Sequence, residues 1–299
     1  MREGHMRPAP TILVTGVNGQ VGFELLRTLQ GLGHVVACDR TMLDLSDLDQ
    51  VRAVVRDLKP AVIVNPAAYT AVDQAETAID AARRLNTDVP RVLAQEALRL
   101  NALLVHYSTD YVFDGTKEGV YVETDETNPQ NVYGLTKLDG ERAIAATGCD
   151  HLILRTSWVY GRRGKNFLLT MLKLAAERSE LRVVVDQLGA PTWSNSIAAA
   201  TAHILAQCLA PNAGNVRAPQ SGVYHLAAGG ETSWHGFAQE IFRLALGDKA
   251  PRVLPIAASE YPTPARRPAN SRMSGAKLAG TFGIRMPAWN EALRLCLDS

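Results

Sequence analysis

The first 160 residues of the chain alternate short apolar runs with longer segments in which apolar residues recur every three or four positions. Short apolar runs bounded by glycine, proline or aspartate predict buried strands, and the longer periodic segments predict helices. Strands that are joined through helices run parallel and are covered on both faces. The pattern predicts strands at 11–15, 34–39, 42–44, 61–65, 103–108 and 151–155, with helices at 21–32, 47–58 (N-cap Ser46) and 75–100.

The rhythm loosens after about residue 160, where expected helices at 167–178, 196–209 and 235–246 are separated by loops rich in proline, glycine and asparagine. The most loop-like segment is 211–222. We therefore expect an α/β protein with a Rossmann-like, doubly wound parallel sheet and a smaller C-terminal substrate lobe. The expected dinucleotide-binding domain comprises 11–160 with parts of about 190–230, and the substrate lobe comprises about 161–190 and 231–299.

Composition narrows the class of protein but does not decide its chemistry. The net charge is +1, from 31 basic and 30 acidic residues, so bulk charge recruits neither nucleic acid nor a membrane surface. The four cysteines are isolated and are expected to be buried or incidental thiols in a reducing compartment. No apolar run reaches the roughly 18 residues of a membrane span. We expect a cytoplasmic protein; whether residues 1–10 are native is left open.

A glycine-rich turn joins the first expected strand to the first helix. Gly16, Gly19 and Gly22 permit a tight turn, a close approach of the backbone to a pyrophosphate, and packing of the helix on the strand. The phosphates then lie at the start of the helix, beside Gln20 and Val21, where free N–H groups and the helix dipole favour anions. The turn predicts a dinucleotide site.

Two further segments extend this predicted site. Asp39 closes the second strand, where a carboxylate receives the adenosine ribose, and Arg40 next to it suits a 2′-phosphate, so NADH and NADPH both stay open. Asp44 and Leu45 either flank the adenine or form an ordinary exposed helix start. Small residues after a core strand let a cofactor lie close or simply pack tightly; they include Ala67 and Ala68, followed by Tyr69 and Thr70.

The candidate catalytic residues follow this site in chain order. Tyr133 and Lys137 are four residues apart, so on a helix they share one face. A nearby cation favours a phenolate and brings the pKa of a tyrosine down towards neutral pH. Lys137 would also hold the nicotinamide ribose. Thr109, followed by Asp110, ends a core strand at the edge where α/β sheets bind ligands, and its hydroxyl would bind a substrate carbonyl.

Several stretches of the chain together resemble a known family: 16–22, 65–73 (NPAAYTAVD), 108–115 (STDYVFDG), 133–137 and 155–161 (RTSWVYG). They resemble the extended short-chain dehydrogenase/reductases and, within these, the dTDP-4-dehydrorhamnose reductases. The likeness continues through 187–192 (QLGAPT) and 267–268, so it covers nearly the whole chain.

The resemblance implies NAD(P)H-dependent reduction of the 4-keto group of dTDP-4-dehydro-L-rhamnose to dTDP-L-rhamnose. It implies sugar contacts from Thr109, Asp110, Tyr133 and Trp158, with Tyr133 as the proton donor and Trp158 as a flat wall for the hexose. Tyr133 and Lys137 are also expected at the nicotinamide end of the cofactor. The other implied cofactor contacts are Gly19, Gln20, Val21, Asp39, Asp44, Leu45, Ala68, Tyr69 and Thr70.

Other functions on the same fold were weighed. A 4,6-dehydratase needs a glutamate base where this chain has Tyr111, which is ill suited to that task. An epimerase uses the same tyrosine and lysine, so it stays an alternative. A non-catalytic NADP-binding subunit, like the β subunit of methionine adenosyltransferase, is a second alternative, although Thr109, Tyr133 and Lys137 favour catalysis.

The resemblance leaves the assembly open. Some members of the family form dimers through Mg²⁺ held by carboxylates of two subunits. Glu24 matches one such ligand, whereas 193–195 lacks the second acid. We predict no metal-ligating residue and a monomer or weak homodimer, with Mg²⁺ uncertain.

Overall fold

The computed structural model describes residues 9–210 and 221–299. Its centre is a six-stranded, fully parallel sheet, which confirms the expected doubly wound α/β fold. From one edge to the other the strands are β2 (His34–Ala37), β1 (Thr11–Val14), β3 (Val62–Asn65), β4 (Leu103–Thr109), β5 (His151–Thr156) and β10 (Gly222–His225). Residues 211–220 of the expected loop lie outside the described residues.

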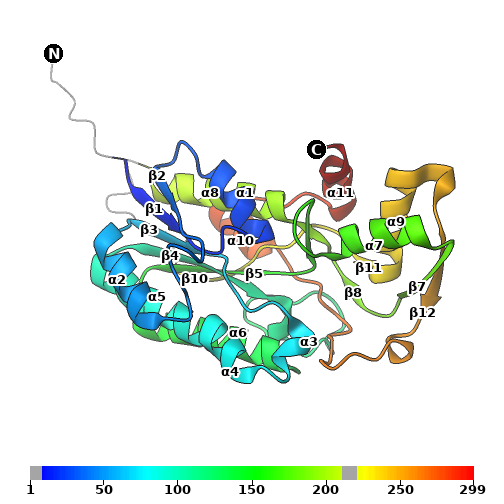
Figure 1. Ribbon diagram of the computed structural model, residues 1–299, viewed down its shortest axis with the longest axis horizontal. Coiled ribbons are helices and arrows are strands. Elements are labelled where there is room, and N and C mark those ends of the chain that lie inside the picture. Colours follow the sequence, from blue (N-terminus) through cyan, green and yellow to red (C-terminus); the bar gives the residue numbers. More distant parts are fainter. Residues whose placement is uncertain (1–8, 211–220) are drawn as a thin grey trace, which may run out of the picture.

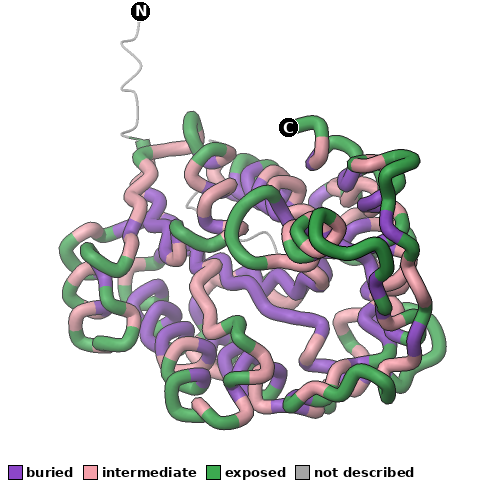
Figure 2. Tube along the Cα trace, turned by 45° about the vertical axis from the view of Figure 1, so that its right-hand side comes forward, coloured by how far each residue is buried: buried purple, intermediate pink, exposed green. Residues whose placement is uncertain are grey.

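Helices cover both faces of this sheet (Figure 1). One face carries α1 (Gln20–Thr28), α8 (Ser194–Cys208) and α10 (Ala276–Phe282), and the other carries α2 (Leu48–Leu58), α5 (Val89–Leu100) and α6 (Val132–Thr147). Side chains alternate along a strand, so Ile12 and Val14 pack in the core under α1, α8 and α10, whereas Leu13 packs in the core under α2, α5 and α6. Figure 2 shows the buried strands at the centre and exposed loops around them.

The helical sequence over 75–100 is interrupted rather than continuous. It forms α3 (Val72–Ala75), α4 (Ile79–Arg83), a π-helical turn η1 (Arg84–Asp88) and then α5. Asn86 of η1 is fully buried against α6, where a β-carbon on Gly140 would lie 2.1 Å from its carbonyl oxygen. Close packing of η1 on α6 therefore accompanies the break in the helix.

Two local predictions were wrong. The strand expected at 42–44 is a turn, because the Asp39 carboxylate accepts hydrogen bonds from Thr41 N (2.8 Å) and Thr41 Oγ1 (2.6 Å) and bends the chain away from β2. The sheet therefore ends at β2. The N-cap of α2 is Asp47, which accepts from the N–H groups of Asp49 and Gln50, and not Ser46, whose hydroxyl donates to Asp44.

The C-terminal part contains small two-stranded sheets beside the main one. These pair β6 (Val159–Tyr160) with β9 (Thr192–Trp193), β7 (Glu180–Val184) with β12 (Arg252–Ile256), and β8 (Leu188–Gly189) with β11 (Thr232–Ser233). Helices α7 (Phe167–Glu177), α9 (Trp234–Leu246) and α11 (Trp289–Asp298) share an aromatic-rich core with them. Short 3-10 turns are η2 (Asp110–Val112), η4 (Gly247–Lys249) and η5 (Ala258–Glu260).

Two observations bear on composition and on domain organisation. All four cysteines are buried free thiols, as expected. Leu278 and Phe282 of α10 pack into the core beneath the main sheet, although they fall in the range predicted for the substrate lobe.

None of the helices in 9–210 and 221–299 combines the length and apolar character that a bilayer span requires.

Candidate active site

The glycine turn lies where the order of strands in the parallel sheet reverses. β1 has β2 as its neighbour on one side and β3 on the other. Gly16 has φ +56°, and a β-carbon there would lie 2.8 Å from Ala67 Cα in the segment after β3. A β-carbon on Gly22 would lie 2.2 Å from Gly16 O. The sequence thus needs glycine at both positions for the turn, α1 and residue 67 to approach this closely.

The first turn of α1 is prepared for an anion. Its N-cap is Gly19, which offers no side-chain cap, and no acidic residue occupies the first turn. Unsatisfied N–H groups and the helix dipole attract phosphate under these conditions. Val21 lies in this turn and packs against the core, while the Gln20 side chain is turned to a loop, accepting at Oε1 from Asn166 Nδ2 (2.8 Å).

The residues predicted for the adenosine end lie beyond β2, in the turn that replaces the expected strand. Hydrogen bonds from Thr41 lower the pKa of Asp39, and those from Ser46 lower the pKa of Asp44, so both stay ionised. Arg40 and Asp44 are exposed, while Leu45 packs on the core of the α2 face. The structure leaves an acid and a base side by side here, as the sequence does.

Asn86 organises the segment after β3. Its Oδ1 accepts from Tyr69 N (2.8 Å), and its Nδ2 donates to Tyr69 O (3.2 Å) and to Thr136 Oγ1 (3.1 Å). The side chain therefore ties the predicted cofactor segment 67–70 to α6. We did not predict Asn86 as a site residue, and its signal was a polar residue inside an otherwise apolar helical pattern.

The catalytic candidates meet where β4 ends. Asn131 caps α6 by accepting from Gly134 N (2.8 Å), and a β-carbon on Gly134 would lie 2.2 Å from Tyr111 O. This close approach brings the side chain of Tyr133 next to that of Thr109. The ring of Tyr111 lies edge-on to that of Tyr133, with centroids 5.5 Å apart.

Burial dominates the electrostatics of this cluster. It raises the pKa of Tyr133, an effect that the neighbouring Thr109 hydroxyl opposes and the charge of Asp110 reinforces. Burial also raises the pKa of Asp110 to about 6, against hydrogen bonds from Ser271 and Thr109. The shift of Tyr133 is opposite to the lowering that we expected from Lys137. A phenol with a raised pKa keeps its proton at neutral pH.

Lys137 lies on the same helix as Tyr133, but its amine is buried between α6 and β4. The residue is only 1 % exposed; its Nζ donates to Tyr107 O at 2.5 Å and lies 3.1 Å from His106 Nε2. Burial lowers the pKa of Lys137 to about 8, while the Glu141 carboxylate acts in the opposite direction. No part of our sequence analysis had pointed to His106.

A segment from the C-terminal part completes the cluster. Arg267 forms an ion pair with Asp73 (Nη2 to Oδ2, 2.8 Å) and a hydrogen bond with the Tyr111 hydroxyl, and Ser271 bonds the Asp110 carboxylate. Asp73, Arg267 and Ser271 were not predicted as site residues. Asp73 and Arg267 belong to stretches that carried the resemblance, whereas Ser271 gave no signal.

Trp158 is held rigidly after β5. It has φ +47°, unusual for a residue with a side chain, and its ring stacks on Trp234 with centroids 3.6 Å apart. A β-carbon on Gly189 would lie 2.7 Å from Trp158 Cε2, so only glycine leaves room for the indole. Trp234 therefore covers one face of the Trp158 ring.

Glu24, the residue considered for a metal ion, faces an amide. Glu24 Oε2 accepts from Asn195 Nδ2 at 3.0 Å, so the amide occupies the position in which a second acid was sought. Across 9–210 and 221–299, no three His, Cys, Asp or Glu side chains gather as metal ligands would. The oligomeric state stays a prediction.

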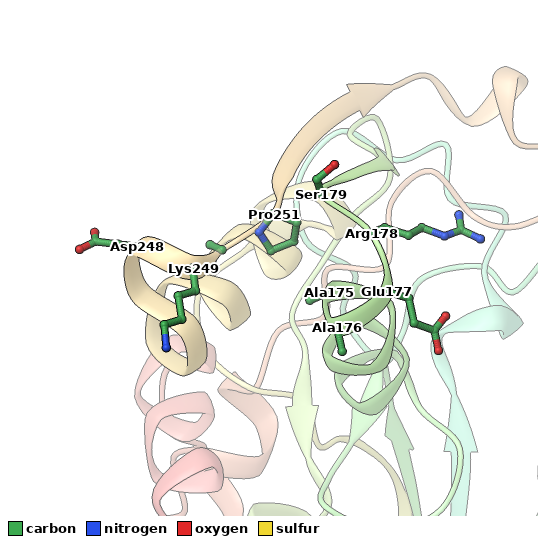
Figure 3. Close-up of a pocket in the computed structure, with 9 residues that line it drawn as sticks. Ala175, Ala176, Glu177, Arg178, Ser179, Asp248, Lys249 and Pro251 are labelled. Atoms are coloured by element: carbon green, nitrogen blue, oxygen red, sulfur yellow. The ribbon is translucent and has the colours of Figure 1, made fainter.

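Two hollows on the surface lie away from this cluster. One, of about 440 Å³, is lined by 175–179 and 248–251. Figure 3 shows Asp248 and Lys249 pointing to one side and Glu177 and Arg178 to the other, so no charged groups converge in it. The second, of about 350 Å³, is lined by 261–267 together with Val184, Gln187 and Ala258, and borders the site at Arg267 and at Ala265, whose N–H donates to Asp73 Oδ1 (3.2 Å).

Comparison with known proteins gives a consistent result. The family model described as the RmlD substrate binding domain matches residues 10–299. The chain is 53% identical over 292 residues to the dTDP-4-dehydrorhamnose reductase of Burkholderia thailandensis, covering 96% of this chain and 97% of the relative. A crystal structure of such a reductase from Clostridium acetobutylicum has a TM-score of 0.89 and 38% identity, covering 96% and 98%. One from Bacillus anthracis in complex with NADP has a TM-score of 0.88 and 34% identity, covering 97% and 99%.

Proposed function

The chain belongs to the dTDP-4-dehydrorhamnose reductase family, and from this premise we propose how its residues carry out the reaction. The protein is an NAD(P)H-dependent oxidoreductase that reduces the 4-keto group of dTDP-4-dehydro-L-rhamnose, giving dTDP-L-rhamnose. The observation that carries the assignment is the convergence of Thr109 and Tyr133 at the carboxyl end of β4, where α6 packs against Tyr111.

The residues around the glycine turn fit a dinucleotide. The uncapped start of α1 suits the pyrophosphate, and Gly16 and Gly22 lie where any β-carbon would collide with backbone. We assign cofactor binding to the predicted set, and NADP is the form bound in the Bacillus anthracis relative. That set is Gly16, Gly19, Gln20, Val21, Gly22, Asp39, Arg40, Asp44, Leu45, Ala67, Ala68, Tyr69, Thr70, Tyr133 and Lys137.

The bound cofactor supplies the hydride. The protein supplies the proton, and Tyr133 is suited to this because its raised pKa keeps the phenol protonated at neutral pH. Thr109 holds the phenol and would bind the same carbonyl oxygen that receives the proton.

The remaining assignments concern the sugar. Asp110 sits beside Thr109, and its buried carboxylate has one oxygen, Oδ2, without a partner among the described residues. We propose that this oxygen accepts a hydrogen bond from a sugar hydroxyl. We propose Trp158, which is braced between Trp234 and Gly189, as the wall for the hexose ring. We propose that residues 11–160 with parts of 190–230 bind the cofactor, and that 161–190 and 231–299 enclose the sugar nucleotide.

The test is oxidation of NADPH by the purified protein in the presence of dTDP-4-dehydro-L-rhamnose, followed by loss of the reduced-nicotinamide absorbance. Tyr133→Phe removes only the hydroxyl, so it should lower turnover by about 100- to 10,000-fold while NADPH still binds. Tyr160→Phe is the matched control, because the Tyr160 hydroxyl is buried in the core of the C-terminal part and has no hydrogen-bond partner within 9–210 and 221–299. It should react as the wild type does.

The contrary outcomes are distinct. Protein that binds NADPH but leaves its absorbance unchanged across a panel of nucleotide-linked keto sugars would support a non-catalytic binding subunit. Turnover of another keto sugar in preference to the dTDP-linked one would keep the reductase chemistry and reject the assigned substrate.

A further inference from the structure

The loop formed by residues 161–166, between β6 and α7, lies against the start of α1. The guanidinium of Arg163 is over the ring of Phe23, 4.2 Å from its centroid. A β-carbon on Gly164, which has φ +79°, would lie 3.3 Å from Gln20 Cγ. This loop leads into α7, so the C-terminal part of the protein contacts the helix start that we assign to the pyrophosphate.

Asn166 connects the loop to α1 through its side-chain amide. Its Oδ1 accepts from Leu169 N (3.1 Å) and so caps α7. The two hydrogens of Nδ2 are shared among three oxygens, which are Gly161 O (2.8 Å), Arg163 O (3.2 Å) and Gln20 Oε1 (2.8 Å). Turning the amide over would place Oδ1 against two backbone carbonyls and Nδ2 against a backbone N–H. The backbone therefore fixes which end of the Asn166 amide faces Gln20.

The fixed amide of Asn166 in turn fixes that of Gln20. Because Asn166 presents a donor, the end of the Gln20 side chain that faces it must be the carbonyl oxygen Oε1. The NH₂ group of Gln20 then lies on the side away from Asn166. No group within 9–210 and 221–299 accepts a hydrogen bond from this NH₂ group. Gln20, the first residue of α1, thus presents two N–H donors that the described protein leaves without an acceptor.

We propose that Asn166 is a positioning residue, which holds the Gln20 amide with its NH₂ group directed at the pyrophosphate of the bound cofactor. The inference rests on the proposed function. An NH₂ group donates to a phosphate oxygen, and a hydrogen bond to an ionised acceptor is stronger than one between neutral groups. The carbonyl end of the same amide would repel the anion. The segment that we assign to the sugar nucleotide therefore also contributes to cofactor binding, through Gln20.

A double-mutant cycle on NADPH affinity, measured by calorimetric titration, tests this role. Asn166→Ser keeps an N-cap oxygen for α7 but removes the NH₂ group that orients Gln20. Gln20→Met keeps the length of the side chain and removes its amide. We expect Asn166→Ser to raise the Kd of NADPH about 3- to 10-fold, and Gln20→Met to raise it about tenfold or more. The double variant should have the Kd of Gln20→Met alone, because Asn166 acts only through the amide.

A purely structural role of Asn166 gives a different result. If Asn166 only held the loop in place, its loss would weaken NADPH binding by the same factor with or without the Gln20 amide. The double variant would then show the product of the two single losses. That product, or an unchanged Kd in either single variant, would overturn the proposal. Asn166→Thr, which also retains an N-cap oxygen, takes the place of Asn166→Ser if the latter does not fold.

A second ligand locates the interaction. Adenosine 2′,5′-bisphosphate carries the adenosine end of NADPH but no pyrophosphate bridge, so its Kd should be equal in the wild type and all three variants. Weaker binding of this ligand by the same factors as NADPH would place the effect elsewhere and reject the proposal.

Ser233→Asn is the matched control. Ser233 is the N-cap of α9, another helix of the C-terminal part, and accepts from Gly236 N at 3.0 Å. The substitution makes the reverse exchange of cap residues, and the protein should bind NADPH as the wild type does. A loss equal to that of Asn166→Ser would show a general effect of these caps and overturn the proposal.

The titrations use no sugar nucleotide, so a protein that binds NADPH but fails to oxidise it counts only against the proposed function. In an active enzyme, Asn166→Ser should raise the KM for NADPH and leave kcat at saturating NADPH unchanged, because the lost interaction is one of binding. A lowered kcat with an unchanged KM for NADPH would contradict the positioning role.

Discussion

The two ends of the predicted active site are built by different means. At the glycine turn the chain itself makes the site: Gly16, Gly22 and Ala67 bring backbone into contact, and no side chain caps α1. At the end of β4, side chains make it: Thr109, Tyr133 and Arg267 come from segments far apart in the sequence. The backbone site depends on glycines that carry no β-carbon. The side-chain site depends on which side chains are present and on their protonation.

The largest expected effect is at the backbone end. In Gly22→Ala the added β-carbon would lie 2.2 Å from Gly16 O, so the turn or α1 must move. We expect NADPH affinity, measured by fluorescence titration, to fall by at least about 100-fold. Gly280→Ala in α10, where a β-carbon meets nothing within 4 Å, should bind NADPH normally and gain about 1 kcal/mol of stability. Normal NADPH binding by Gly22→Ala would show that the close contact between the turn and α1 is not needed for cofactor binding.

The next effect concerns protonation at the side-chain end. The pKa of Asp110 is about 6 in the folded protein, above its ordinary 3.8, so between these pH values the native state binds more protons than the unfolded state. Its ionisation should therefore cost stability as the pH rises from 4 to 6, by up to about 3 kcal/mol. Asp110→Asn should remove this slope in urea unfolding.

Asp49→Asn provides the comparison for that experiment. The Asp49 side chain is 95% exposed, so the same substitution there should leave the pH dependence of unfolding unchanged. If Asp110→Asn and the wild type keep parallel curves between pH 4 and 6, the carboxylate is ionised in the folded protein throughout, and the burial argument fails.

The smallest effect should come from a single hydroxyl. Thr109→Val removes the hydroxyl group that donates to Asp110 Oδ1 (3.0 Å) and lies beside Tyr133, and turnover should fall about 10- to 100-fold. Thr156→Val is matched, because Thr156 is the partner of Thr109 on β5 and its buried hydroxyl has no partner among the described residues. Equal turnover in both variants would remove Thr109 from the mechanism.

The same contrast explains what the sequence could predict. The glycine turn and the order of strands follow from contiguous patterns, so they were predictable. The segment around Leu43 was wrongly predicted as a strand. Leu43 is buried, at 2% exposure, but lies in a turn. An apolar residue that fills the core from a turn cannot be distinguished from a strand residue by its apolar character alone. The direction of the Tyr133 pKa was wrong because we counted a cation and not the loss of solvent.

A chain of buried polar side chains that leads to Lys137 was beyond prediction for a different reason. Its members Thr15, Asn65 and His106 end or lie within three separate strands, and each reads alone as a polar interruption of an apolar run. Only the pairing of β1 with β3 and of β3 with β4 brings them into line. Side-chain networks of this kind need the tertiary register before their members can be recognised.

The π-helical turn η1 constrains how this stretch of chain can vary in length. Such a turn is an α-helix with one residue too many. Deleting one residue from η1 would restore regular α-helix, but it would rotate the residues on one side by about 100° relative to those on the other. Asn86 would then lose either Tyr69 or Thr136, which it now joins. Among related sequences, we expect gaps to avoid residues 84–88.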